Sequence, residues 1–144
     1  MWGFTNGKER DMTELEKVRE FFSNDKYATE ATGIEIAEIG ENYAKTMLKL
    51  DGRHKNARGG LMGAVPYTMA DFTFAVATNA GKEYGTVSTT GCMSNTAVPK
   101  GDALIAESRM IKEGRTLCVY DITVTDNLGT LVAKVTINGM HIYK

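Results

Sequence analysis

One uninterrupted segment, residues 56–71, constrains the fold more than any other part of this 144-residue chain. It reads NARGGLMGAVPYTMAD, so a glycine-rich turn leads directly into helical sequence. Proline is tolerated in the first turn of a helix, and Gly81 stands where a helix is commonly capped. The pattern predicts a helix from Ala64 to about Ala80 that is almost free of charge except for Asp71. A helix this apolar must be surrounded by other elements, and a carboxylate buried on it needs a reason.

Most of the remaining sequence alternates between polar and apolar residues, as β-strands do. Two strands are expected at residues 34–39 and 43–50, and four more at 86–98, 103–112, 117–125 and 131–143. A short amphipathic helix is predicted between residues 13 and 24, where Thr13 and Glu16 have the spacing of a capping box. This order of elements predicts an α+β fold in which a curled, mostly antiparallel sheet surrounds one long central helix.

Length and charge narrow the class of protein. The chain fits a single domain, residues 1–144, with residues 1–12 as a candidate flexible extension. Lys and Arg number 17 against 18 Asp and Glu, and there is no basic run, so nucleic acid is not expected as a partner. No apolar run approaches the roughly 20 residues that cross a bilayer, and the N-terminus lacks the apolar centre of a signal peptide. A cytoplasmic protein is expected.

The cysteines and histidines suggest neither a disulfide nor a metal centre. Cys92 and Cys118 lie in strand-like sequence without a CxxC pair, so both are expected to be small buried residues. His54 and His141 lack the spacing of a metal-binding motif. No metal site and no separate cofactor are predicted.

Two groups in residues 56–71 suit chemistry at a carbonyl. Asp71 shares a helix face with Thr68 and small residues, and a carboxylate in a poorly hydrated cleft can activate water or attack a carbonyl itself. Gly63 precedes the helix, so its N–H is among the unpaired donors that can face an oxyanion. Simpler interpretations remain open: Asp71 complements the helix dipole, and the glycines only form a turn. The sequence contains no phosphate-binding glycine motif.

Spacing implies that one chain cannot form such a site alone. Gly63 and Asp71 are eight positions apart, which is about 12 Å along a helix and too far for both to contact one carbonyl. Two copies related by a two-fold axis, with their long helices antiparallel, would bring Gly63 of one copy near Asp71 of the other. This predicts a homodimer with two composite sites. Open sheet edges favour further association into a tetramer, as a dimer of dimers.

The segment resembles the motif of the hotdog-fold acyl-CoA thioesterases, in the branch of PaaI-like proteins and thioesterase superfamily member 2. Asn56, Gly59, Gly63 and Asp71 fall at the offsets of that family's motif, and the resemblance covers most of the chain. It implies a hotdog fold, a homo-oligomer, and hydrolysis of acyl-CoA thioesters to free acid and coenzyme A. Coenzyme A is then part of the substrate.

The resemblance also implies roles for individual residues. The Gly63 N–H would polarise the thioester carbonyl, and Asp71 of the second chain would act as general base or nucleophile. Asn56 would place the carbonyl or the water, and Thr89 would orient the water. Further substrate contacts are expected at Gly59, Met62 and Thr68. Basic residues that could meet the phosphates of coenzyme A are Lys55, Arg58, Lys100, Arg109, Lys112 and Arg115.

Two departures from the family motif leave other functions open. Met62 stands where the family usually has histidine, and Ala64 replaces its second glycine. Met62 could, with Met47, Met69 and Met93, line an acyl pocket, or these side chains could belong to the core. The alternatives are a non-catalytic acyl-CoA-binding or sensing module, and a hotdog dehydratase or hydratase. The latter chemistry usually needs a histidine paired with an acid, and neither histidine is expected beside the helix.

Overall fold

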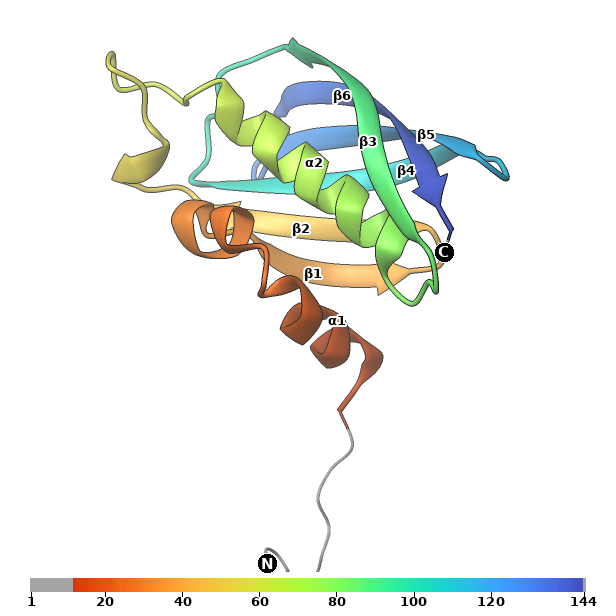
Figure 1. Cartoon of the computed structure of the whole chain (residues 1–144). Helices are drawn as coiled ribbons and strands as arrows, with labels where there is room; N and C mark the ends of the chain where they lie inside the picture. Colours follow the sequence, from red (N-terminus) through yellow and green to blue (C-terminus); the bar gives the residue numbers. More distant parts are fainter. Residues whose placement is uncertain (1–11, 144) are drawn as a thin grey trace, which may run out of the picture.

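The computed structural model describes residues 12–143, whose arrangement is drawn in Figure 1. The elements follow in the order α1 (Glu14–Phe22), η2 (Tyr27–Thr32), β1 (Glu35–Gly40), β2 (Tyr43–Lys49), η3 (Gly52–His54), α2 (Ala64–Asn79), β3 (Gly85–Asn95), β4 (Ala103–Glu113), β5 (Leu117–Asp126) and β6 (Leu131–Ile142). Both expected helices and all six expected strands are confirmed. The π-helical turn η2 and the 3₁₀ turn η3 were not expected. Of the candidate extension, only Met12 lies within the described residues.

The six strands form one antiparallel sheet in the order β1-β2-β4-β5-β6-β3, which curls around α2 (Figure 1). This confirms the α+β architecture with one central helix. Ten of the sixteen residues of α2 are buried, because the curl covers the helix on more sides than a flat sheet would. The edges of the sheet are β1 and β3, and β3 follows α2 directly in the chain.

Close packing fixes α2 against the sheet. The Phe74 ring meets Tyr120 of β5 edge to face, with 5.6 Å between centroids. Gly139 of β6 makes this approach possible, since a Cβ there would lie 2.5 Å from the Phe74 ring. The Thr73 and Thr46 hydroxyls, both buried, join α2 to β2 at 2.7 Å. The helix therefore has one position in the curl, which places its N-terminus and Asp71 reproducibly.

Both histidines are buried and hold the fold together. His54 Nδ1 accepts the Asp51 N–H at 3.0 Å, and its Nε2 bonds the Thr32 carbonyl at 2.7 Å, which ties the loop before residue 56 to η2. At the other end of the sheet, His141 lies between Thr86, 2.7 Å from Nδ1, and the Glu113 carboxylate. Neither ring lies beside Gly63 or the middle of α2.

The two cysteines differ from one another. Cys118 is buried, as expected, and burial together with the nearby Glu113 charge raises the pKa of its thiol to about 11. Cys92 is exposed, so the prediction that it is buried was wrong. The reason is that β3 is an edge strand, in which Thr86 is buried, Met93 is half-buried and every other residue is exposed.

Across residues 12–143, no helix combines the length and the apolar character that a membrane-spanning segment needs.

A buried carboxylate, Asp126, fastens the two loops at the end of β5. Its oxygens accept the N–H groups of Lys100, Gly101, Leu128 and Thr130 at 2.7–3.0 Å. Burial alone would raise the pKa of Asp126, but the four donors outweigh it and hold the pKa well below its usual range. The loop that contains Pro99 is thereby fixed relative to the sheet.

Replacing Asp126 by Asn should lower Tm at neutral pH. A carboxyl whose folded pKa is depressed stabilises the fold above its unfolded pKa of about 3.9, and the contribution is lost as pH falls toward the folded value. The difference in Tm between parent and Asp126→Asn should therefore be largest near neutral pH and shrink below about pH 4. Calorimetric melts across this range measure it. A difference that is constant with pH would show that the charge of Asp126 is not responsible.

Candidate active site

The candidate site lies along the strip where α2 faces the edge strand β3, which runs antiparallel to it. Three pairs of residues follow this strip: Gly63 with Asn95, Tyr67 with Gly91, and Asp71 with Ser88. A Cβ on Gly63 would lie 3.9 Å from Asn95 Nδ2, and a Cβ on Gly91 would collide with the Tyr67 hydroxyl. Gly63, Tyr67 and Asp71 are spaced by four residues each, so they form one row on the exposed side of the helix.

Asp71 lies at the open edge of the molecule and not in a closed cleft of its own chain. The residue as a whole is exposed in the single chain. Burial of the carboxylate against α2 and β3 nevertheless raises its pKa, a hydrogen bond from Ser88 lowers it in part, and the charge of Asp25 raises it further. The net direction is upward, toward the pKa of a useful general base. Solvent still reaches this group, so the burial effect should strengthen if another molecule covers the strip.

Gly63 presents its backbone to the outside. It is the N-cap residue of α2 with a helical φ of −59°, and no residue among 12–143 accepts its N–H. None of the described residues requires glycine here, because φ is ordinary and a Cβ would meet no atom of theirs closer than Asn95 Nδ2 at 3.9 Å. The missing side chain therefore leaves room for something that is not part of this chain.

Asn56 builds the turn that leads to Gly63. Its Oδ1 accepts the N–H groups of Arg58 at 2.9 Å and Gly60 at 3.0 Å, and its Nδ2 donates to the Leu61 carbonyl at 3.4 Å. Gly59 in the same turn has a φ of +87°, which favours glycine. One N–H of the Asn56 amide is left for another acceptor. Asn56 thus shapes the loop in the single chain, and its predicted contact with substrate stays a prediction.

A β-bulge decides which hydroxyl of β3 faces Asp71. The register against β6 shifts between Ser88 and Thr90. This bulge interrupts the regular alternation of side chains between the two faces of the sheet around Thr89. Ser88 forms the hydrogen bond with Asp71, whereas the Thr89 hydroxyl donates to the Asn138 carbonyl at 3.2 Å. Counting offsets along the sequence selected Thr89 because a bulge leaves no reliable sign in the sequence. Ser88, Tyr67 and Asn95 are the residues of this strip that sequence reasoning missed.

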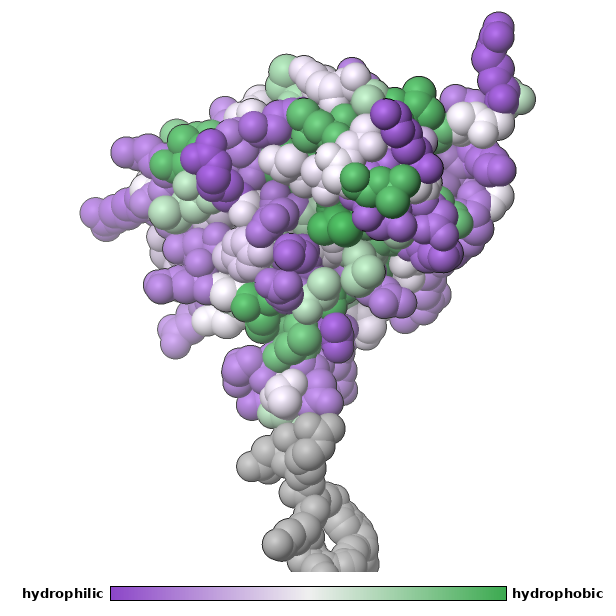
Figure 2. Space-filling model, turned by 180° about the vertical axis from the view of Figure 1, so that it is seen from behind, coloured by the Kyte–Doolittle hydropathy of each residue, from purple (hydrophilic) through white to green (hydrophobic). Residues whose placement is uncertain are grey.

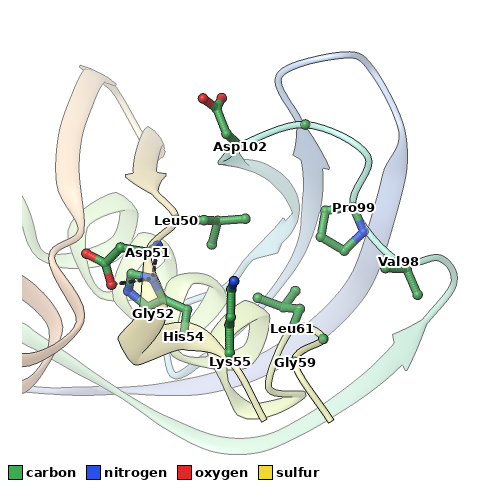
Figure 3. Close-up of a pocket in the computed structure, with 12 residues that line it drawn as sticks. Leu50, Asp51, Gly52, His54, Lys55, Gly59, Leu61, Val98, Pro99 and Asp102 are labelled. Atoms are coloured by element: carbon green, nitrogen blue, oxygen red, sulfur yellow. Dashed lines mark hydrogen bonds and ion pairs between the residues drawn. The ribbon is translucent and has the colours of Figure 1, made fainter.

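Two neighbouring cavities lie at the Gly63 end of the strip. One, of about 430 Å³, is lined by Asn56, Gly63 and Asn95 among others. The second, of about 340 Å³, shares Leu61, Val98 and Pro99 with it and is drawn in Figure 3, where Lys55 extends between Leu50 and Leu61. A ligand that reaches Gly63 therefore has a path past one basic side chain.

The other predicted contact residues lie at different distances from these cavities. Met62 is exposed beside Gly63, and the Thr68 hydroxyl donates to the Ala64 carbonyl at 3.0 Å. Arg109 lies on the outer face of the sheet, where it pairs with Asp121 at 3.2 Å. Arg115 follows β4 near Tyr143, at the end of the sheet opposite Gly63. Of the predicted basic contacts, Lys55 has the position best suited to meet an anion there.

Comparisons with known proteins identify the fold. The chain matches the PaaI protein of the phenylacetic acid degradation operon of Escherichia coli, with a TM-score of 0.81, 21% identity, and coverage of 90% of this chain and 94% of that one. It therefore has the hotdog fold, as its sequence resemblance implied.

One further structure and one protein sequence are also similar to this chain. A hypothetical thioesterase of Streptococcus pneumoniae, solved with coenzyme A, matches with a TM-score of 0.77 and 18% identity over 85% of this chain and 98% of that one. A provisionally named esterase of Archaeoglobus fulgidus is 27% identical over 120 residues, which are 83% of this chain and 77% of that protein. No protein-family model matches the chain.

The hydrogen bond at Asp71 can be tested without any assay of activity. Replacing Ser88 by Ala removes a donor that lowers the pKa of Asp71, so the pKa of that carboxyl should rise. Carbon-13 NMR titration of the Asp71 carboxyl measures the change. Thr89→Val is the matched control and should leave the pKa in place. If Thr89→Val shifts the pKa and Ser88→Ala does not, the sequence-based choice of Thr89 is right.

Proposed function

We propose that this protein is an acyl-CoA thioesterase whose two active sites form between two copies of the chain. The observation that carries the proposal is at Gly63, whose N–H has no acceptor among residues 12–143 and whose missing Cβ leaves space for a ligand. The fold likeness supports the class of reaction, and Asp71, with its raised pKa, supplies the base.

In the proposed reaction, the thioester carbonyl oxygen accepts the Gly63 N–H of one copy. Asp71 of the other copy takes a proton from water, and the resulting hydroxide attacks the carbonyl carbon. The negative charge that develops on the oxygen is stabilised by the same N–H and by the positive end of α2. Collapse of this intermediate breaks the carbon–sulfur bond, and the coenzyme A thiolate leaves and takes up a proton. Direct attack by the Asp71 carboxylate is the other route that this arrangement allows.

The edge strand β3 supports a dimer of this kind. Eleven residues long and paired only with β6, it leaves one row of backbone groups open to another strand. A second copy added along β3 would cover the α2–β3 strip on both chains. That covering would remove water from Asp71 and place it opposite the other chain's Gly63.

The outer face of the sheet supports a tetramer. Val87, Met140 and Leu117 are exposed, and they are direct neighbours across β3, β6 and β5. Figure 2 shows apolar side chains set among hydrophilic ones on the face of the molecule opposite to the view of Figure 1. An apolar row across three strands is suited to packing against the same row of another dimer.

The two groups of the proposed site, the Asp71 carboxylate and the Gly63 N–H, can each be tested with one substitution. We expect Asp71→Asn to lower kcat for thioester hydrolysis by about 10²-fold or more, because a general base typically contributes this much. Gly63→Ala should fold with little change in Tm, since its Cβ has space in the single chain, yet lose activity by obstructing the ligand. Release of coenzyme A from short, long and aromatic acyl-CoA thioesters, measured with a thiol reagent, gives both results. Unchanged hydrolysis by a folded, dimeric Asp71→Asn would falsify the proposed role.

Mixing the two variants tests whether the site needs two chains. A heterodimer of one Asp71→Asn chain and one Gly63→Ala chain has one intact composite site and one doubly impaired site. Purified with two different affinity tags, it should recover about half of the parent activity, although each homodimeric variant is inactive. A site contained within a single chain predicts no recovery.

Met62 gives a reason to keep a binding function as the second candidate. It is exposed beside Gly63, where the resembling family usually has a polar histidine. If the parent protein binds acyl-CoA tightly and releases no thiol from any of the substrates, the chain is an acyl-CoA-binding module.

A further inference from the structure

Tyr67 occupies the middle of the α2–β3 strip, where its half-buried ring packs against the hydrophobic core. Its hydroxyl lies over Gly91, where a Cβ would be 2.1 Å from the oxygen and 3.0 Å from Cζ. Alanine at position 91 would displace the ring, so the ring keeps its place only because β3 carries glycine there. The hydroxyl forms no hydrogen bond with any residue of the described chain, and it is not sealed from solvent.

The two-chain site brings this hydroxyl next to the substrate. A two-fold axis that sets Gly63 of one copy against Asp71 of the other also sets Tyr67 against its own counterpart, because 67 is the midpoint of 63 and 71. The centre of β3 (Gly85–Asn95) lies beside Gly91, so the strand and the helix place the axis at the same point. Tyr67 is then about 6 Å along the helix from each end of both sites.

The direction of the substrate follows from the cavities. Both cavities at the Gly63 end are lined by Val98 and Pro99, and the larger one also by Asn56, so together they offer space for the large coenzyme A portion outside the strip. The acyl group must then extend from the thioester in the other direction, along the strip toward Tyr67. Once a second copy excludes water from the strip, a hydroxyl without a partner is costly, and a polar atom on the acyl group would satisfy it.

We propose that Tyr67 determines substrate specificity by hydrogen bonding an oxygen on the acyl group a few bonds beyond the thioester carbonyl. This rests on the proposed thioesterase function and names its substrate class, which is hydroxyacyl or oxoacyl thioesters rather than plain alkyl ones. A site built to hydrogen bond a substrate oxygen discriminates strongly against analogues that lack it.

The test compares butyryl-CoA with hydroxybutyryl-CoA carrying its hydroxyl on the third or fourth carbon. For the parent, kcat/KM should favour a hydroxylated substrate by about tenfold or more. Tyr67→Phe should bring this preference down to within about threefold by slowing the hydroxylated substrate only. Tyr143→Phe is the matched control, since its hydroxyl bonds the Arg115 carbonyl far from the strip, and it should leave the preference unchanged. Gly91→Ala, which displaces the hydroxyl without removing it, should abolish the preference as well.

Other outcomes overturn the inference in distinguishable ways. If Tyr67→Phe lowers kcat/KM equally for both substrates, or leaves the preference unchanged, the Tyr67 hydroxyl does not hydrogen bond the acyl group. Loss of activity with both substrates, together with dissociation of Tyr67→Phe into monomers measured by light scattering, assigns the hydroxyl to the interface between copies. If the parent releases no thiol at all, the thioesterase proposal fails by itself. In that case, calorimetry measures the binding of the same ligands to the parent and to Tyr67→Phe. Equal affinities of the two proteins for the hydroxylated ligand would reject the proposed role of Tyr67.

Discussion

The structure depends on a helix that its own chain cannot cover completely. Ten of the sixteen residues of α2 are buried, and the curled sheet of the described residues surrounds the helix only as far as its edge strand β3. Along that edge, α2 keeps Gly63 and Asp71 exposed and Tyr67 half-buried between them. The same edge leaves the hydrogen-bonding groups of β3 unpaired. Both deficits lie side by side, so one second copy of the chain could remove both.

This incompleteness leaves the Asp71 carboxylate within reach of solvent. In a single chain the carboxylate lies between α2 and β3, its pKa already raised by burial and by Asp25 but held back by Ser88. Complete burial of an unpaired carboxylate within one chain would cost much free energy. In a site that closes on association, the carboxylate would enter surroundings of low dielectric constant only when the substrate site also forms. In the proposed dimer, covering the strip would raise the pKa of Asp71 further, because it would remove water from the carboxylate.

Much of this architecture could be predicted from the sequence because it follows from local rules. The capping box at Thr13 and Glu16 forms as expected, and Gly81 adopts the positive φ of a helix-terminating glycine. The apolar sequence after Gly63 required a surrounding sheet, and the alternating segments supplied it. Four matched landmarks in residues 56–71 then led to the hotdog fold, which the structural likeness confirms.

What the sequence could not provide depends on tertiary register. The bulge near Thr89 exchanges it for Ser88 beside Asp71, and alternation alone does not locate a bulge. Cys92 looked buried because strand-like sequence does not distinguish an edge strand from a central one. Asn56 has the family's spacing, but its engagement with the backbone of its own turn becomes visible only in the folded loop.

The glycines show how structure refines a motif. Gly59 needs its positive φ, Gly139 makes room for Phe74, and Gly91 makes room for Tyr67, so the fold itself explains all three. Gly63 has neither a special φ nor a neighbour that a side chain would strike. Gly52 and Gly85 likewise have no positive φ and no close neighbour, so Gly63 is distinguished by its place at the N-terminus of α2, with an N–H that no described residue accepts. In the sequence these four residues look alike, and only the packing around each one shows that the backbone of Gly63 is left accessible at the N-terminus of α2.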